Sequence, residues 1–184
     1  MVVDFKNFQN NQMISIKRAT VADASLIAGI GSISVEAAHR ESCSAAVMQA
    51  FISRHYNEPA IQAELQLPTN WYHLVYFNGT AAGFSKIILN TAHENINQKP
   101  VAKLDRLYLL QEYFDRKLGL ALLNFNIELA KQQAQKGIWL YTWVDNSRAL
   151  NFYRKAGFTI AGSHWFEISS THANLNHQLF LPLP

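Results

Sequence analysis

The chain has 184 residues, of which 49% are hydrophobic and 16% charged, and its formal net charge is +3. This length fits one domain, and the 12% of aromatic residues excludes a wholly disordered chain, because those rings need a core. The only cysteine, Cys43, excludes an internal disulfide framework and a cysteine-based zinc or iron–sulfur site.

The net charge is mildly positive, but the sequence has no dense run of lysines and arginines, so we expect no nucleic-acid partner. A small anionic ligand suits this charge better. Apolar runs such as residues 138–144 are shorter than the ~20 residues that cross a bilayer. The first residues lack the basic and apolar regions of a signal peptide. We therefore expect a cytoplasmic protein without a membrane partner.

The N-terminal part of the chain predicts an extension followed by helices. Residues 1–12 are polar and rich in Asn and Gln, so we expect a flexible extension outside a single domain of residues 13–184. Residues 14–17 alternate as a strand does, and Thr20 is a suitable cap for a helix that follows. Residues 32–67 are mostly helical in pattern, with a new helix starting near Pro59.

The middle of the chain predicts three strands. Residues 71–77 are aromatic and β-branched, and residues 81–89 return after Asn78-Gly79, a strong hairpin signal because both residues tolerate positive φ. A polar loop over residues 90–100 then leads into a strand over residues 102–110.

The C-terminal part predicts alternating helices and strands. An apolar stripe predicts a helix over residues 118–136, closed by Gly137. A buried strand over 138–144, a helix over 147–156 closed by Gly157, and strands over 158–161 and 178–181 follow. The fold class is therefore α/β with a mixed sheet.

Two segments carry the candidate chemistry. In residues 145–158, DNSRALNFYRKAGF, a buried strand ends and a capped helix places Asn146, Ala149 and Tyr153 near one face. In residues 104–123, a strand runs through Arg116 and Lys117 into a long helix, whose unpaired N–H groups form an anion site. Each segment alone also fits an ordinary structural turn, with Tyr153 a core residue.

Together, these segments resemble the GNAT-type N-acetyltransferase superfamily, through the pattern N-x-x-A-x-x-F-Y-x-x-x-G-F and the strand feeding an anion-binding helix. The stretch of residues 162–166, GSHWF, is similar to a G-x-H-x-F stretch in bacterial spermine/spermidine acetyltransferases. The resemblance implies a bent, mostly antiparallel sheet of six to seven strands with helices on both faces. It also implies that the fourth and fifth strands splay apart to hold acetyl-CoA.

The resemblance also assigns residues to the acetyl-CoA site. Backbone groups of Leu107 and Leu109 on the fourth strand would pair with the pantetheine arm, and Asn146 would contact it. The remaining cofactor-binding positions, around the pyrophosphate loop and the last helix, are Tyr108, Asp115, Arg116, Lys117, Leu118, Gly119, Leu120, Phe152 and Lys155.

The pyrophosphate loop departs from the family pattern Q/R-x-x-G-x-G/A. Residues 116–121 fit it literally, whereas an ungapped alignment puts Phe114 at the Gln/Arg position and Lys117 at the first Gly. We favour the ungapped alignment, because the leucine-rich flanks then both match. A lysine there weakens close backbone approach but adds charge.

Direct attack of an amine on a thioester needs a base for the amine and an acid for the leaving thiolate. The resemblance makes Tyr153 the acid. For the base we expect Asp105, which alternation places on the same strand face as Leu107. The alternative is that Asp105 is an ordinary surface carboxylate paired with a neighbouring lysine or arginine. Glu36 and Glu41 are the other carboxylates that could line the amine pocket.

The predicted activity is transfer of an acetyl group from acetyl-CoA to a small amine, with a polyamine as the first candidate. The alternatives are a peptide or protein amine acceptor, or a non-catalytic acyl-CoA-binding module. Seven histidines show no recognised metal-ligand spacing, so we expect no metal. The resemblance also implies that a homodimer is one alternative for the oligomeric state, because members of the family are often dimers.

Overall fold

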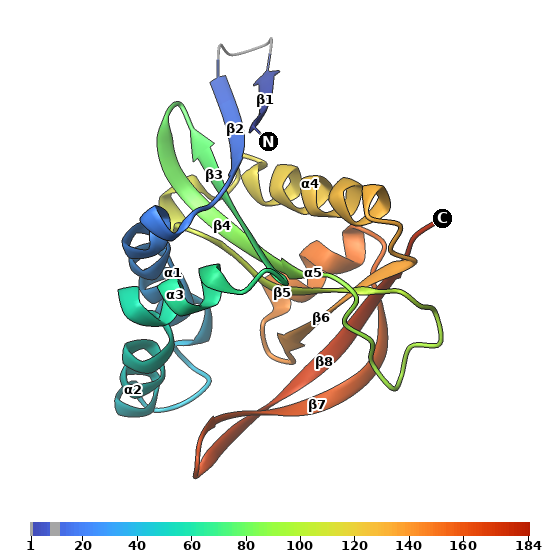
Figure 1. Cartoon of the computed structure of the whole chain (residues 1–184). Helices are drawn as coiled ribbons and strands as arrows, with labels where there is room; N and C mark the ends of the chain where they lie inside the picture. The colour runs from blue at the N-terminus through green and yellow to red at the C-terminus, as the bar shows by residue number, and fades with distance from the viewer. Residues whose placement is uncertain (1, 8–11) are drawn as a thin grey trace.

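The computed structural model describes residues 2–7 and 12–184, which form one eight-stranded sheet in the order β1-β2-β3-β4-β5-β6-β8-β7 (Figure 1). Neighbouring strands pair antiparallel except β5 and β6, which run parallel. The strands are β1 (Val2–Asn7), β2 (Gln12–Arg18), β3 (Asn70–Phe77), β4 (Thr80–Ile88), β5 (Ala102–Leu109), β6 (Gly137–Trp143), β7 (Thr159–Ser169) and β8 (His172–Pro182).

Helices cover both faces of the sheet, as predicted (Figure 1). They are α1 (Ala24–His39), α2 (Ala45–His55), α3 (Glu58–Gln66), α4 (Leu118–Gln132) and α5 (Ser147–Lys155). One core cluster joins the sheet to α4 and α5, and a second joins the opposite face to α1, α2 and α3. The mixed, three-layered architecture of the predicted fold class is thereby confirmed.

The strand β1 is an addition to the expected sheet. Residues 2–7 pair antiparallel with β2 over six residue pairs, so this part of the polar N-terminal segment extends the sheet at its edge. The family's fourth and fifth strands therefore correspond to β5 and β6. Residues 1 and 8–11 lie outside the described residues, so their flexibility stays a prediction.

The chain reversal between β3 and β4 follows the sequence signal. Asn78 and Gly79 both adopt positive φ, 49° and 84°, as a tight hairpin turn needs. The end of α4 differs from the prediction: the helix stops at Gln132, and Ala134 takes the left-handed conformation. Gly137 instead begins β6, where a Cβ atom would lie 2.3 Å from the Phe180 ring. Its role is therefore close packing rather than helix termination.

The hairpin of β7 and β8 is longer than the sequence patterns suggest. Each strand has 11 residues, and the residues 162–166 that resemble the G-x-H-x-F stretch lie within β7. β7 is an edge strand, with Ile160 and Trp165 more than half exposed. Apolar and polar residues alternate only weakly along β7, because both faces of this edge strand carry exposed apolar side chains.

One segment of the described chain, Val21–His39, is long and apolar enough to cross a membrane by length and hydropathy alone. It contains α1, whose residues Ile27, Ile30 and Val35 are buried in the core cluster against the sheet. A core helix of a globular domain has the same composition, so this segment is weak evidence for a membrane span.

Candidate active site

The central feature of the site is the divergence of β5 and β6. These strands pair only at Ala102 with Ile138 and at Lys103 with Trp139, and beyond those residues no pairing joins them. A cavity of about 420 Å³ lies along the diverging segments and is lined by residues of β5, β6, α1, α2, α5, β7 and β8. The predicted splay of these two strands is therefore present.

The edge of β5 that faces this gap has peptide groups unpaired by β6. On the other edge, the Leu110 N–H donates to the Ala82 carbonyl of β4. The peptide groups of every second residue, counted back from Leu110, therefore point toward β4. Leu107 and Leu109 then present their peptide groups to the gap, and Ser34 Oγ donates to the Leu109 carbonyl at 3.1 Å. The structure thus brings to the gap the two positions predicted to pair with a pantetheine arm.

The loop before α4 has the backbone geometry that a glycine would supply. Lys117, the residue that precedes the helix, has φ 59°, and Asp115 has φ 62°, both in the left-handed region. This matches the ungapped alignment, which places Lys117 at a family glycine. Asp115, Arg116 and Lys117 of the loop are exposed, as is Leu120 in the first turn of α4, whereas Leu118 is buried in the core.

The start of α4 lies at the far end of the β5 edge. A Cβ atom at Gly119 would be 3.4 Å from a Leu109 methyl carbon and 3.8 Å from the Phe152 ring. The Arg148 guanidinium lies 3.4 Å from the Phe114 ring centroid and so joins α5 to the loop. Strand edge, helix N-terminus and α5 therefore form one continuous surface. Lys155 is exposed at the far end of α5 and does not line the cavity.

Asp105 does not share a strand face with Leu107, contrary to the alternation argument. The pairing of β4 with β5 shifts between Lys86 and Ile87, whose partners are Arg106 and Leu104, so Asp105 is the extra residue of a β-bulge. Leu104 and Leu107 consequently pack on the same side, against the α4 cluster. Asp105 contacts Lys86 on the opposite face.

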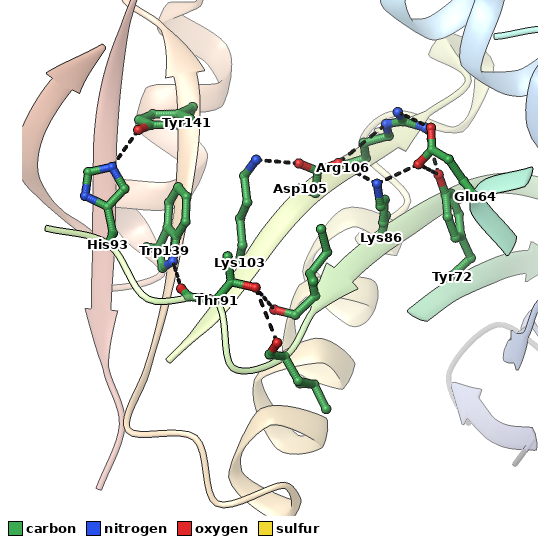
Figure 2. Close-up of polar contacts among 12 residues, drawn as sticks. Glu64, Tyr72, Lys86, Thr91, His93, Lys103, Asp105, Arg106, Trp139 and Tyr141 are labelled. Carbon is green, nitrogen blue, oxygen red and sulfur yellow. Dashed lines mark hydrogen bonds and ion pairs between the residues drawn. The ribbon is translucent and has the colours of Figure 1, made fainter. Parts of the chain in front are cut away.

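The Asp105 carboxylate is held in ion pairs (Figure 2). Lys103 Nζ lies 2.7 Å and Lys86 Nζ 3.1 Å from its oxygens. Burial raises the pKa of Asp105, but Lys103, Lys86 and Arg106 outweigh it and lower that pKa to about 2. So weak a base does not suit removal of a proton from an amine. The alternative, a carboxylate paired with nearby cations, describes Asp105 better.

A second carboxylate completes this buried network (Figure 2). Glu64 on α3 accepts hydrogen bonds from the Tyr72 hydroxyl at 2.7 Å, from Arg106 Nη2 at 2.8 Å and from Lys86. Burial raises the pKa of Glu64, and Arg106, Lys86 and Tyr72 together bring it below its usual value. The network fixes the bulged part of β5 against α3.

Glu36 and Glu41, expected to line an amine pocket, do not lie at the cavity. Both are exposed, Glu36 on the outer face of α1 and Glu41 in the turn after it. The apolar stripe of α1 packs on the sheet, which turns its charged positions to solvent.

Two predicted residues, the cap residue of α5 and one residue within that helix, do lie at the cavity. Asn146 caps the helix by accepting from the Ala149 N–H at 3.0 Å, and it lines the cavity. Tyr153 lines it too, with its ring 5.1 Å from Phe152 and 5.4 Å from Phe158 between ring centroids. Burial, and then Tyr108, raise the pKa of Tyr153, so its phenol is protonated at neutral pH.

Several cavity residues were not predicted. They come from elements far apart in the sequence and are His39, Phe51, His55, Trp143, Phe166 and Glu167. The sequence carries two signals for these residues, the seven histidines and the stretch of residues 162–166 that includes Phe166, and neither points to the cavity by itself. Among residues 2–7 and 12–184, no group of three or more His, Cys, Asp or Glu side chains is arranged to hold a metal ion.

Comparisons with known proteins agree with this geometry. The Acetyltransferase (GNAT) family profile matches residues 35–158. An uncharacterized N-acetyltransferase of Lactobacillus delbrueckii subsp. lactis is 27% identical over 65% of this chain and 69% of its own length. One of Methanocaldococcus jannaschii is 32% identical over 44% of this chain, but the match spans only 35% of that protein.

Solved structures share the fold. The PaiA N-acetyltransferase from Thermoplasma acidophilum, in complex with coenzyme A, aligns with a TM-score of 0.72 at 20% identity, over 92% of this chain and 99% of that one. The ribosomal-protein-S18-alanine N-acetyltransferase from Escherichia coli aligns with a TM-score of 0.63 at 19% identity, over 92% and 94%. With the profile match, the splayed strands and the α5 motif, the chain belongs to the GNAT acetyltransferase family, whose enzymes use acetyl-CoA as the acetyl donor.

Proposed function

We propose that this enzyme transfers an acetyl group from acetyl-CoA to the primary amine of a small molecule, by direct attack in the cavity between β5 and β6. The observation that carries the proposal is the unpaired edge of β5, which leads from the cavity to the N-terminus of α4. We place the reaction in the cytoplasm, where the single cysteine stays reduced.

The residues at this edge fit acetyl-CoA by their chemistry. The peptide groups of Leu107 and the N–H of Leu109 can pair with the amides of a pantetheine arm as another strand would, while the Leu109 carbonyl already accepts from Ser34. The free N–H groups of residues 115–120, with the helix dipole, suit a pyrophosphate, and Arg116 and Lys117 add positive charge. Asn146 keeps its side-chain N–H groups as donors for the arm.

The chemistry requires one bond to form and one to break. The amine nitrogen bonds to the acetyl carbon, the carbon–sulfur bond breaks, and the sulfur leaves with the electron pair. Tyr153 is our acid: its phenol gives a proton to that sulfur and regains one from the amine nitrogen. The proton that the ammonium loses before the attack passes through a base to solvent, so the protons balance over each turnover.

The charges around the cavity favour an acceptor with one amine over a polyamine. A polycation needs several free carboxylates, but Asp105 and Glu64 are already paired with Lys86, Lys103 and Arg106. Apart from these, Glu167 is the carboxylate of the described chain that lines the cavity. We therefore propose an acceptor that carries a single positive charge.

The test is thiol release from acetyl-CoA with matched panels of primary monoamines, spermidine and spermine, and short peptides. We expect turnover with a monoamine and a lower kcat/KM for the polyamines. The single Cys43 can add at most one thiol per chain, so repeated turnover is unambiguous. Preference for spermidine would overturn the monoamine assignment, and CoA binding without turnover for any amine would indicate a non-catalytic module.

Lys117 offers a test of the pyrophosphate loop. Lys117→Glu should weaken CoA binding about tenfold or more, because it reverses a charge beside the phosphates. Lys117→Gly relieves a left-handed backbone strain of about 1 kcal/mol, so it should raise the melting temperature while it weakens CoA less than Lys117→Glu. Equal CoA affinity for all three proteins, measured by calorimetry, would show that Lys117 plays no part in binding.

A further inference from the structure

The reaction proposed above lacks a base, because the carboxylates predicted for that role do not serve it. Asp105 is ion-paired and strongly acidic, and Glu36 and Glu41 lie outside the cavity. An amine with a pKa near ~10 is almost wholly protonated at neutral pH, so a group in the cavity must take its proton.

The C-terminal half of α1 lies across the gap between β5 and β6. Ser34 Oγ donates to the Leu109 carbonyl at 3.1 Å, which holds the helix on the free edge of β5. Five residues later, the His39 ring lies 6.0 Å from the Trp143 ring of β6, between ring centroids. One helix therefore touches both diverging strands, with His39 on the β6 side.

His39 also shares the proposed reaction cavity with Tyr153. Both side chains line the same space of about 420 Å³, together with Val35, one turn earlier on α1. His39 is half-buried, with its ring against Trp143, and it forms part of the cavity wall. From this placement we propose that His39 is the general base that takes the proton of the acceptor ammonium; the assignment rests on the proposed acetyl transfer.

The protonation state of His39 suits that role. Burial lowers the pKa of His39 below its usual 6.5, so the ring is neutral and able to accept a proton at pH 7. The other titratable groups of the cavity wall come from several elements around it. They are Lys103, Asp105, Arg106 and Tyr108 on β5, Tyr141 on β6, Tyr153 on α5, His55 on α2, Tyr56 directly after α2, and Glu167 on β7.

His55 is the rival for the same role. It lines the cavity, and burial, then Arg54 and Arg106, lower its pKa. Its ring packs on Phe51 of the same helix, 4.6 Å between centroids, whereas the His39 ring packs on Trp143 of β6, one of the two diverging strands. His39 is therefore the better placed of the two.

The test compares pH profiles of kcat/KM for the wild type, His39→Gln, His55→Gln and His164→Gln. His164 is an exposed control on β7, outside the cavity wall. We expect His39→Gln to lose about a hundred- to ten-thousand-fold in kcat/KM at pH 7. It should also lose the fall in rate expected of the wild type as pH drops through the lowered pKa of His39. His164→Gln should keep both, and CoA should still raise the melting temperature of His39→Gln.

Two further results decide the assignment. His39→Ala leaves space in the cavity, and added imidazole should restore part of its activity, which a purely structural histidine would not allow. The proposal is overturned if His39→Gln keeps the wild-type pH profile, or if His55→Gln loses it instead. A wild type that releases no thiol with any amine overturns the proposed function rather than this assignment alone.

Discussion

Replacing Tyr153 by phenylalanine is expected to lower kcat by about a hundred- to ten-thousand-fold, the usual worth of a general acid. The ring keeps its packing against Phe152 and Phe158, so the melting temperature should change little. CoA affinity should fall by no more than one hydrogen bond contributes, about 0.5–1.5 kcal/mol.

Tyr76→Phe is the matched control for this variant. Tyr76 lies on β3, away from the cavity wall, with Lys17 5.0 Å above its ring centroid. Its kcat should equal that of the wild type. A Tyr153→Phe enzyme within a few-fold of wild-type kcat, and less stable, would mean that Tyr153 is a core residue and that another group protonates the sulfur.

Replacing Glu64 by glutamine is expected to cost about 3–5 kcal/mol of unfolding free energy, because it leaves Lys86 and Arg106 without their main anionic partner. In a protein of this size that corresponds to a loss of about 6–20 °C in melting temperature. The Lys86 and Arg106 side chains are only 9% and 13% exposed, so water compensates little.

Glu128→Gln is the matched control, since the pair of Glu128 with Lys131 lies on the surface of α4, where both side chains are well exposed. Removing it should cost less than about 1 kcal/mol. Equal melting temperatures for the two variants would contradict the account of the buried network.

The same network predicts how stability depends on acid. Asp105 and Glu64 have lowered pKa values in the folded chain, so each adds stability that is present above its unfolded pKa near ~4. That stability is lost as pH falls through the folded pKa, which for Asp105 is about 2. The melting temperature of the wild type should therefore drop steeply between about pH 5 and pH 2. Glu64→Gln should show a shallower drop over that range.

Local patterns in the sequence predicted local structure well. The Asn78-Gly79 turn and the Asn146 cap of α5 each depend on a few neighbouring residues, and the structure contains both. The splay of β5 and β6 followed from the resemblance of the surrounding motifs to a known family.

Features that depend on distant partners were missed. The bulge at Asp105 is set by the pairing of β5 with β4, so simple alternation assigned that side chain to the wrong face. His39 and Trp143 are separated by more than a hundred positions in the chain, and only the packing of α1 over the sheet brings their rings together. The sequence pattern similarly predicts that Gly137 ends a helix, but in the structure the Phe180 ring leaves no space for a side chain at this position.

A thermal-shift titration of the wild type with CoA tests the central claim most directly. If CoA binds the folded chain along the β5 edge and the start of α4, a concentration of a hundred times Kd should stabilise the protein by about 2.7 kcal/mol. The melting temperature should then rise by about 5–10 °C and continue to rise with CoA concentration. No rise at millimolar CoA would contradict the account of this site, as an enzyme and as a binding module alike.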